Sequence, residues 1–171
     1  MSPETIFRLH LILGYVVWLT CFGAYIWPWL KSLTTFDAQR AIATLHSFRF
    51  FGLAFMLPGM VSPDLPASFA IPAGYGDLTT GLLALLALLT ARKRLLFWLF
   101  VAAFNVVGTV DIVLAYIHAI EAGVPANAGL MGAMYVIPVI YVPLLMITHG
   151  AAFYLLLRRT RWVPNPSRAT G

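Results

Sequence analysis

The sequence predicts an all-α integral membrane protein, a compact bundle of about five transmembrane helices connected by short loops. Of its 171 residues, 61% are hydrophobic and 10% are charged, whereas soluble domains carry roughly 25% charged residues. Five apolar segments have the roughly 20 residues that an α-helix needs to cross a hydrocarbon layer of about 30 Å. Basic residues also concentrate in alternate connections, as expected when successive helices cross a bilayer in opposite directions.

The predicted transmembrane helices are residues 6–30, 41–61, 72–91, 95–120 and 130–157. The connections after the second and fourth helices contain prolines and glycines, which end helices. They are short, so neighbouring helices are predicted to pack antiparallel. Residues 1–157 are therefore predicted to form a single transmembrane bundle.

Individual residues refine the first and last helices. The first apolar segment lacks a basic leader and a clear cleavage site, so we expect a helix of the mature protein. It contains the only cysteine, Cys21, which excludes an intramolecular disulfide; no metal site is predicted. In the last segment, Pro138 and Pro143 each remove a backbone donor, which predicts a kink or a locally opened hydrogen-bond ladder.

The distribution of charge predicts the orientation of the bundle. Lysines and arginines of short loops are retained in the cytoplasm. They occur in the first loop, in the third loop and after the last helix: Lys31, Arg40, Arg92, Lys93, Arg94, Arg158, Arg159, Arg161 and Arg168. The other side carries Glu4, Arg8, Asp64 and Glu121. This asymmetry predicts an external N-terminus and a cytoplasmic C-terminus, in a bacterial inner membrane. Residues 158–171 are predicted to be a basic, disordered tail that faces anionic lipid, so its charge requires no nucleic acid.

Ionisable side chains inside the predicted helices are the candidate functional residues, because a charge in a bilayer needs a partner or a task. They are predicted to form two layers. The cytoplasmic half holds His46, Arg49, Asn105 and His149, and the outer half holds His10, Asp77, Asp111 and His118. Small residues follow several of them at helical spacing, which predicts packed rather than lipid-facing surfaces. Examples are the stripes that begin at His10 on the first helix and at Asp77 on the third.

Each candidate also has a structural interpretation. Asp77 lies about five residues from the expected start of its helix, where a carboxylate caps free amides. Arg49 can extend toward the headgroups, and Asn105 can join two helices. Asp111 and His149 are the hardest to explain structurally, because both are expected deep in the bilayer.

The preferred hypothesis is an intramembrane polar cavity that binds a small hydrophobic or amphiphilic ligand, such as a sterol, isoprenoid, quinone or lipid. The ligand-binding candidates are His46, Arg49, Asp77, Asn105, Asp111, Tyr141 and His149. Asp77, Asp111 and His149 are the candidates for acid–base chemistry of an isomerase type, although the sequence leaves open whether the protein is an enzyme. The last four predicted helices, with an acidic residue early in one helix and a polar residue deep in the next, are similar in layout to the emopamil-binding-protein type of sterol isomerase.

Three alternatives remain at this point. A haem b electron carrier could use His46 with His149 and His10 with His118 as paired axial ligands. A proton-coupled transporter or channel subunit could use the carboxylates and histidines as a relay. A non-catalytic subunit of a membrane complex could use the same groups only to specify helix pairing. The sequence also leaves open a homo-oligomer or a larger complex.

Overall fold

Helices account for nearly all of the described chain. The structure is a computed structural model that describes residues 1–160, and within this range it contains no β-strand. Four of its helical segments are long and apolar enough to cross a membrane: Pro3–Ser32, Ala67–Leu89, Arg94–Glu121 and Ile137–Arg158. All four correspond to predicted spans. The predicted tail begins within the last helix, and residues 161–171 lie outside the described residues.

The first and last candidate spans each contain a π-helical turn that ends two residues before a proline, Pro28 and Pro143. The first runs through α1 (Pro3–Cys21), the π-helix η1 (Phe22–Ile26) and α2 (Trp27–Ser32). The last runs through the π-helix η4 (Ile137–Tyr141) and α6 (Val142–Thr160). In both, the residue before the proline donates its N–H five residues back, Trp27 to Phe22 and Val142 to Ile137. The locally opened ladder predicted from Pro138 and Pro143 is thus confirmed.

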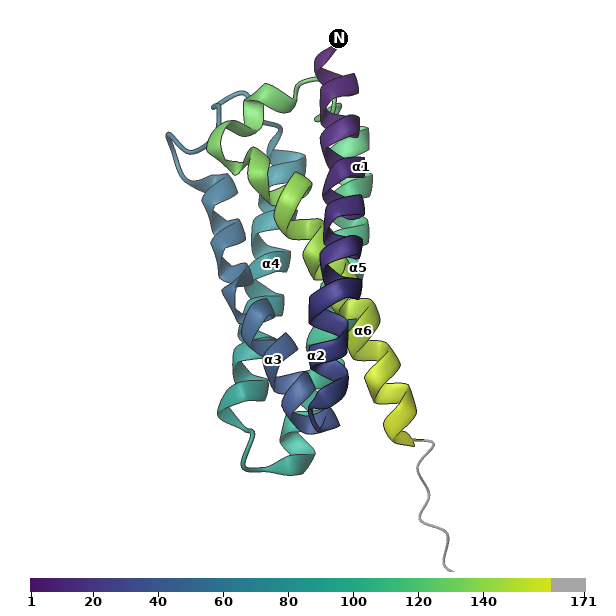
Figure 1. Cartoon of the computed structure of the whole chain (residues 1–171). Helices are drawn as coiled ribbons and strands as arrows, with labels where there is room; N and C mark the ends of the chain where they lie inside the picture. The colour runs from purple at the N-terminus through teal and green to yellow at the C-terminus, as the bar shows by residue number, and fades with distance from the viewer. Residues whose placement is uncertain (161–171) are drawn as a thin grey trace, which may run out of the picture.

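The predicted second helix is divided in two. Residues 41–61 fall on α3 (Thr35–Ser47), on the 3-10 helix η2 (Phe48–Met56) and on the following loop. This division explains why the segment is absent from the four long apolar helices of the described chain, although α3 and the segment after it extend along most of the bundle (Figure 1). A 3-10 helix has three residues per turn, and the buried residues of η2 are Arg49, Gly52 and Phe55. The 3-10 geometry therefore continues the buried face of His46 in steps of three.

The last predicted helix also begins differently. Residues 130–135 belong to the 3-10 helix η3 (Ala128–Tyr135), which is interrupted at Gly132 with a φ of 51°. That φ suits glycine, since it has no Cβ. A Cβ at Gly132 would also lie 2.6 Å from the carbonyl oxygen of Met60.

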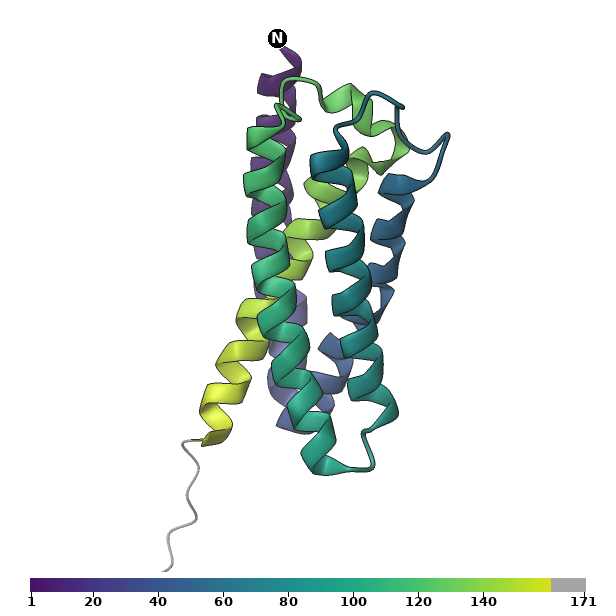
Figure 2. The same cartoon turned by 180° about the vertical axis from the view of Figure 1, so that it is seen from behind.

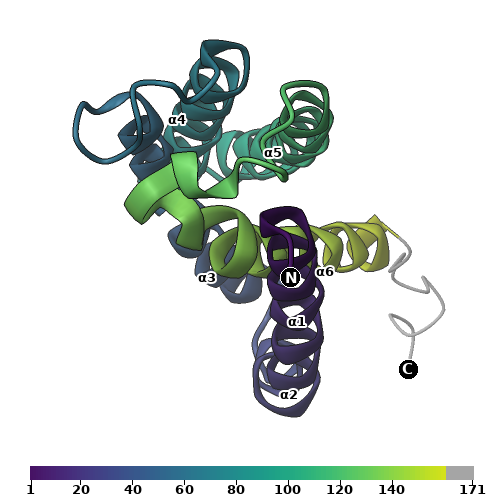
Figure 3. The same ribbon diagram turned by 90° about the horizontal axis from the view of Figure 1, so that it is seen from above.

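The helices α4 (Ala67–Leu89) and α5 (Arg94–Glu121) pack side by side and antiparallel (Figure 2). The other face of α4 packs on α3 and η2, and α6 packs on α1, α3 and α5. Viewed from above, α1 lies at the margin of the bundle (Figure 3). Because of this position, the predicted packing of the His10 stripe of α1 holds only in part: Gly14 lies against Val139 of η4, whereas Val17 is 56% exposed.

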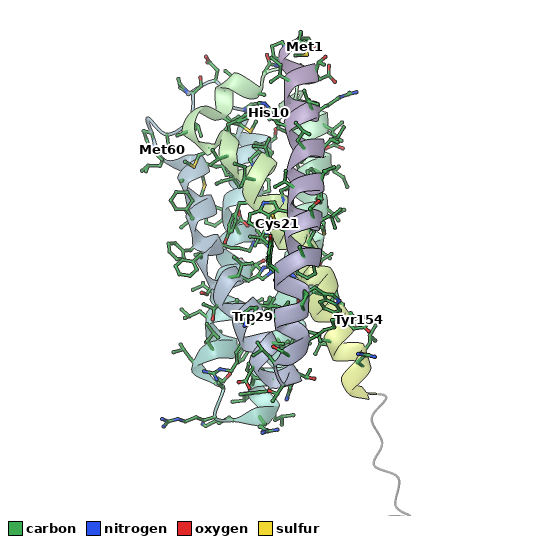
Figure 4. The ribbon with its side chains drawn as sticks, viewed as in Figure 1. Met1, His10, Cys21, Trp29, Met60 and Tyr154 are labelled. Atoms are coloured by element: carbon green, nitrogen blue, oxygen red, sulfur yellow. The ribbon has the colours of Figure 1, made fainter. Side chains whose placement is uncertain are left out.

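The ends of the bundle differ in charge. The turns around Lys31 and Lys93 and the C-terminal part of α6 lie at one end, and the N-terminus and the loop after η2 lie at the other (Figure 1). Figure 4 shows Trp29 and Tyr154 toward the basic end, and His10 toward the N-terminal end. The described basic residues predicted to share one side therefore do lie at one end: Lys31, Arg40, Arg92, Lys93, Arg94 and Arg158. Arg161 and Arg168 lie outside the described residues.

Candidate functional site

A buried ionic cluster joins three elements at mid-height of the bundle. Arg49 of η2 donates from Nε to Oδ1 of Asp77 on α4 at 2.6 Å and from Nη2 to Oδ2 of Asp111 on α5 at 2.5 Å. Its side chain is 1% exposed, against 12% for Asp77 and 13% for Asp111. A guanidinium at this depth is stable only when its charge is compensated and its donors are satisfied. Both carboxylates supply that compensation.

The remaining terminal nitrogen of the guanidinium connects the cluster to α6. Arg49 Nη1 lies 3.3 Å from the carbonyl oxygen of Gly108 and 3.3 Å from Nε2 of His149. Because arginine can only donate, Nε2 of His149 is the acceptor and its Nδ1 carries the proton. That Nδ1 donates to Oδ1 of Asn105 at 2.9 Å, and Asn105 donates from Nδ2 to the Val101 carbonyl. Each hydrogen bond in this series, from Arg49 through His149 to Asn105, therefore joins one donor to one acceptor.

Glycines make room for the charged groups. A Cβ at Gly52 would overlap the carboxylate of Asp77, and a Cβ at Gly76 would overlap that of Asp111. At Gly108, a Cβ would lie 2.6 Å from Arg49 Nη1, His149 Nε2 and Thr80 Cγ2. The close approach of the three elements therefore depends on glycines, which are also common where helices of membrane proteins pack closely.

His46 lies beside this cluster but outside its ionic contacts. Its ring is in contact with that of His149, with 4.1 Å between centroids, and its Nε2 lies 3.0 Å from Oγ1 of Thr148. Its Nδ1 is buried without a hydrogen-bond partner among the described residues, as is Oε1 of the fully buried Gln39 on the same helix. Tyr141 also approaches this region, and its hydroxyl donates to the Leu45 carbonyl at 3.1 Å.

Six of the candidates, which were predicted to lie in two separate layers, therefore form a single cluster. Arg49, Asp77, Asp111, Asn105 and His149 are linked directly, with His46 in ring contact. The long arginine side chain joins the inner group to the outer carboxylates. His10 and His118 are not part of it: His10 Nδ1 lies 2.9 Å from the Tyr135 hydroxyl, and His118 lines a groove between α4 and α5.

The structural interpretation of Asp77 as a helix cap was wrong. The helix begins at Ala67 and contains Pro72 in its interior, so Asp77 lies ten residues from its start. A carboxylate interacts with free amides only in the first turn. Ion pairing with Arg49 replaces that role.

An elongated cavity of about 380 Å³ leads from the cluster toward the N-terminal end of the bundle. Arg49, Asp77 and Asp111 border it at one end, and the Glu4–Arg8 ion pair borders it at the other. Along α5 its lining extends from Asp111 to just beyond the helix end, a rise of roughly 18 Å. Its walls are formed mostly by apolar side chains, among them Phe7, Leu11, Phe55, Phe69, Ala73, Ile112, Ala115, Ala119, Met131 and Ile137.

Asp111 is also accessible from the opposite side. A groove of about 440 Å³ between α4 and α5 is lined by Asp111 together with Gly76 and Thr79. Ala73, Asp111 and Ala115 line both this groove and the elongated cavity. Small residues at these positions leave the carboxylate accessible from two directions.

Sequence reasoning missed several residues of the site. Gln39 lies seven residues before His46, two helical turns away on the same face of α3, and this spacing was the available signal. Thr148 precedes the candidate His149, and Thr80 lies one turn after Asp77. Gly52 and Gly76 could not be recognised from the sequence, because each is important only for its contact with a carboxylate that is distant in sequence.

The histidine geometry does not favour the haem alternative. Two histidines that ligate one haem iron face each other across the porphyrin, whereas the rings of His46 and His149 touch. Both nitrogens of His149 also have partners. His10 and His118 line different grooves, so they form no pair either.

Comparison with known proteins gives one match. Residues 6–157 match the family described as "Domain of unknown function (DUF8737)". No curated protein and no solved structure matches the chain.

Proposed function

The chain belongs to the DUF8737 family, since the family match covers nearly the whole helical region, and we propose that it binds a small amphiphilic molecule inside the membrane. The observation that carries the proposal is the apolar cavity of about 380 Å³ that ends on the buried Asp77–Arg49–Asp111 cluster. Pockets for small ligands combine mostly apolar walls with a few convergent polar groups, in volumes of roughly 300–1,000 Å³. The hydrocarbon part of the ligand occupies the cavity, and its polar end contacts the carboxylates.

The ionic cluster supports this proposal because its construction exceeds what helix pairing requires. Burying three charged groups is costly, and an apolar substitute of similar volume is often at least as stable. The two carboxylates also border the cavity. The cost of burying these charges is therefore better explained by ligand binding than by helix packing alone. Acid–base chemistry by Asp77, Asp111 or His149 is an extension of the same proposal.

Blocking the cavity tests the proposal. Ala115 lines both the cavity and the groove, so a phenylalanine there fills the space beside Asp111. The matched control is Val113→Phe, on the same helix at a position that is 45% exposed. We expect organic extracts of the detergent-purified wild type and Val113→Phe to contain a stoichiometric amphiphile by mass spectrometry, and those of Ala115→Phe to lose most of it. Identical extracts from all three proteins would contradict the proposal.

We further propose that the bundle crosses a bacterial inner membrane five times, with the N-terminus outside. The α3–η2 segment supplies the crossing that is not a long apolar helix. The gathering of Lys31, Arg40 and residues 92–94 near one end supports a cytoplasmic location of that end.

Cysteine labelling tests the orientation. In a Cys21→Ser background, Asp64→Cys and Lys93→Cys place single thiols at exposed positions on opposite ends of the bundle. An impermeant maleimide added to intact cells is expected to label the first variant, and the second only after lysis. The reverse pattern would overturn the proposed orientation, and labelling of both in intact cells would overturn the membrane crossing.

A further inference from the structure

The free hydrogen-bonding capacity at the cluster consists chiefly of acceptors. Of the five N–H donors of a guanidinium, four of Arg49 have partners, and its side chain is nearly inaccessible. The more exposed atoms belong to the carboxylates. Asp77 Oδ2 and Asp111 Oδ1 accept no hydrogen bond from any described residue; Oδ2 packs against Gly52 and Oδ1 against Gly76, and both carboxylates border the cavity. A ligand at this end therefore meets oxygen atoms that accept.

The net charge of the cluster also favours a ligand that donates hydrogen bonds. Two carboxylates face one guanidinium, so the fully ionised cluster has one negative charge in excess. His149 offers no compensating charge to the carboxylates, since its nitrogens contact Arg49 and Asn105. At the mouth of the cavity, Arg8 is paired with Glu4. Inside a low-dielectric bundle, one uncompensated charge is costly.

The mostly apolar wall of the cavity offers few partners for other polar groups of the ligand. The hydroxyl of Tyr116, which also lines the cavity, lies 3.0 Å from that of Tyr15 and is thus already paired. A carboxylate or quinone carbonyl at the cluster would face two carboxylates, with one hindered N–H to bind it. A protonated amine in the cavity would donate to the carboxylates that border it and neutralise the excess charge.

We propose that the ligand is a cationic amphiphile, in which a protonated amine binds between Asp77 and Asp111 and a hydrocarbon chain fills the cavity. This inference rests on the proposed function and specifies the chemical class of its ligand. It also separates the ligand from acceptor-headed amphiphiles such as quinones.

Matched photoreactive probes test the inference. A dodecyl chain with a mid-chain diazirine is prepared with an amine, an alcohol or a carboxylate head, and each probe is added to the full-length protein in phosphatidylcholine nanodiscs. Peptide mass spectrometry then gives the labelling of cavity residues relative to lipid-facing residues of α5. Charge-assisted hydrogen bonds predict about a tenfold preference of the cavity for the amine over the carboxylate. The alcohol is expected to fall between them.

Variants assign the preference to the carboxylates. Asp111→Asn and Asp77→Asn are each expected to reduce the amine preference severalfold, whereas the lipid-facing control Val113→Phe retains it. Equal cavity labelling by amine and carboxylate in the wild type, or a preference for the carboxylate, would overturn the cationic ligand while leaving a binding cavity in place. Cavity labelling no higher than lipid-face labelling for all three probes would overturn the proposed function as well. The wild-type comparison decides the matter even if a variant fails to fold.

Discussion

Replacing Arg49 with methionine is expected to lower the free energy of unfolding by about 3–5 kcal/mol, because it leaves two buried carboxylates without their cation. Methionine retains much of the length of the arginine side chain, so packing changes little. Titration with SDS in mixed micelles measures the change. The control is Arg8→Met, which removes the exposed pair with Glu4 and is expected to cost no more than about 1 kcal/mol.

A combined variant separates charge from packing. Adding Asp77→Asn and Asp111→Asn to Arg49→Met removes all three charges while keeping the side-chain shapes nearly constant. If uncompensated charge causes the loss, this triple variant recovers most of the stability of the wild type. A triple variant as unstable as Arg49→Met alone would show that the arginine acts through packing. An Arg49→Met protein as stable as Arg8→Met would show that the cluster is not a buried ion-pair network.

Helix boundaries that depend on the length of an apolar segment could be predicted from the sequence. The predicted helix 95–120 differs from α5 (Arg94–Glu121) by one residue at each end, because a long apolar segment between charged residues leaves little choice of boundary. The start of α4 was missed by five residues, since Pro72 was taken as the first residue of the helix. Proline is tolerated inside helices of membrane proteins when neighbours satisfy the freed groups.

The site was only partly accessible, for two physical reasons. Its ionisable residues were all candidates, because charge within an apolar segment is conspicuous. Their grouping was not predicted, because depth along each helix was estimated separately, whereas the side chain of Arg49 spans the difference. The change to a 3-10 helix after Ser47 was missed as well. Its signal was the spacing of three between His46, Arg49, Gly52 and Phe55, which an α-helical interpretation also accommodates.

The role of the glycines could be recognised only from the tertiary structure. A methyl group at Gly108 would be placed 2.6 Å from atoms of Arg49, His149 and Thr80, and a contact of that length forces a displacement. Since helix α5 contributes both Gly108 and Asp111, the displacement would separate Arg49 from its carboxylate partner and from His149 together. Gly108→Ala therefore acts on the same cluster as Arg49→Met, but through steric overlap rather than charge.

Gly108→Ala is expected to lower the free energy of unfolding by about 1–3 kcal/mol, the usual cost of overpacking a tight contact. Gly150→Ala is the matched control, because it lies in α6 with nothing within 4 Å of its added Cβ; it is expected to raise stability by about 0.5–1 kcal/mol through helix propensity. Adding Thr80→Ser to Gly108→Ala removes one of the three overlapping atoms and keeps the hydroxyl that donates to the Gly76 carbonyl, so part of the loss should be recovered. If Gly108→Ala and Gly150→Ala changed stability alike, the helices would not approach as closely at Gly108 as the structure shows, and the ionic cluster would need a looser geometry.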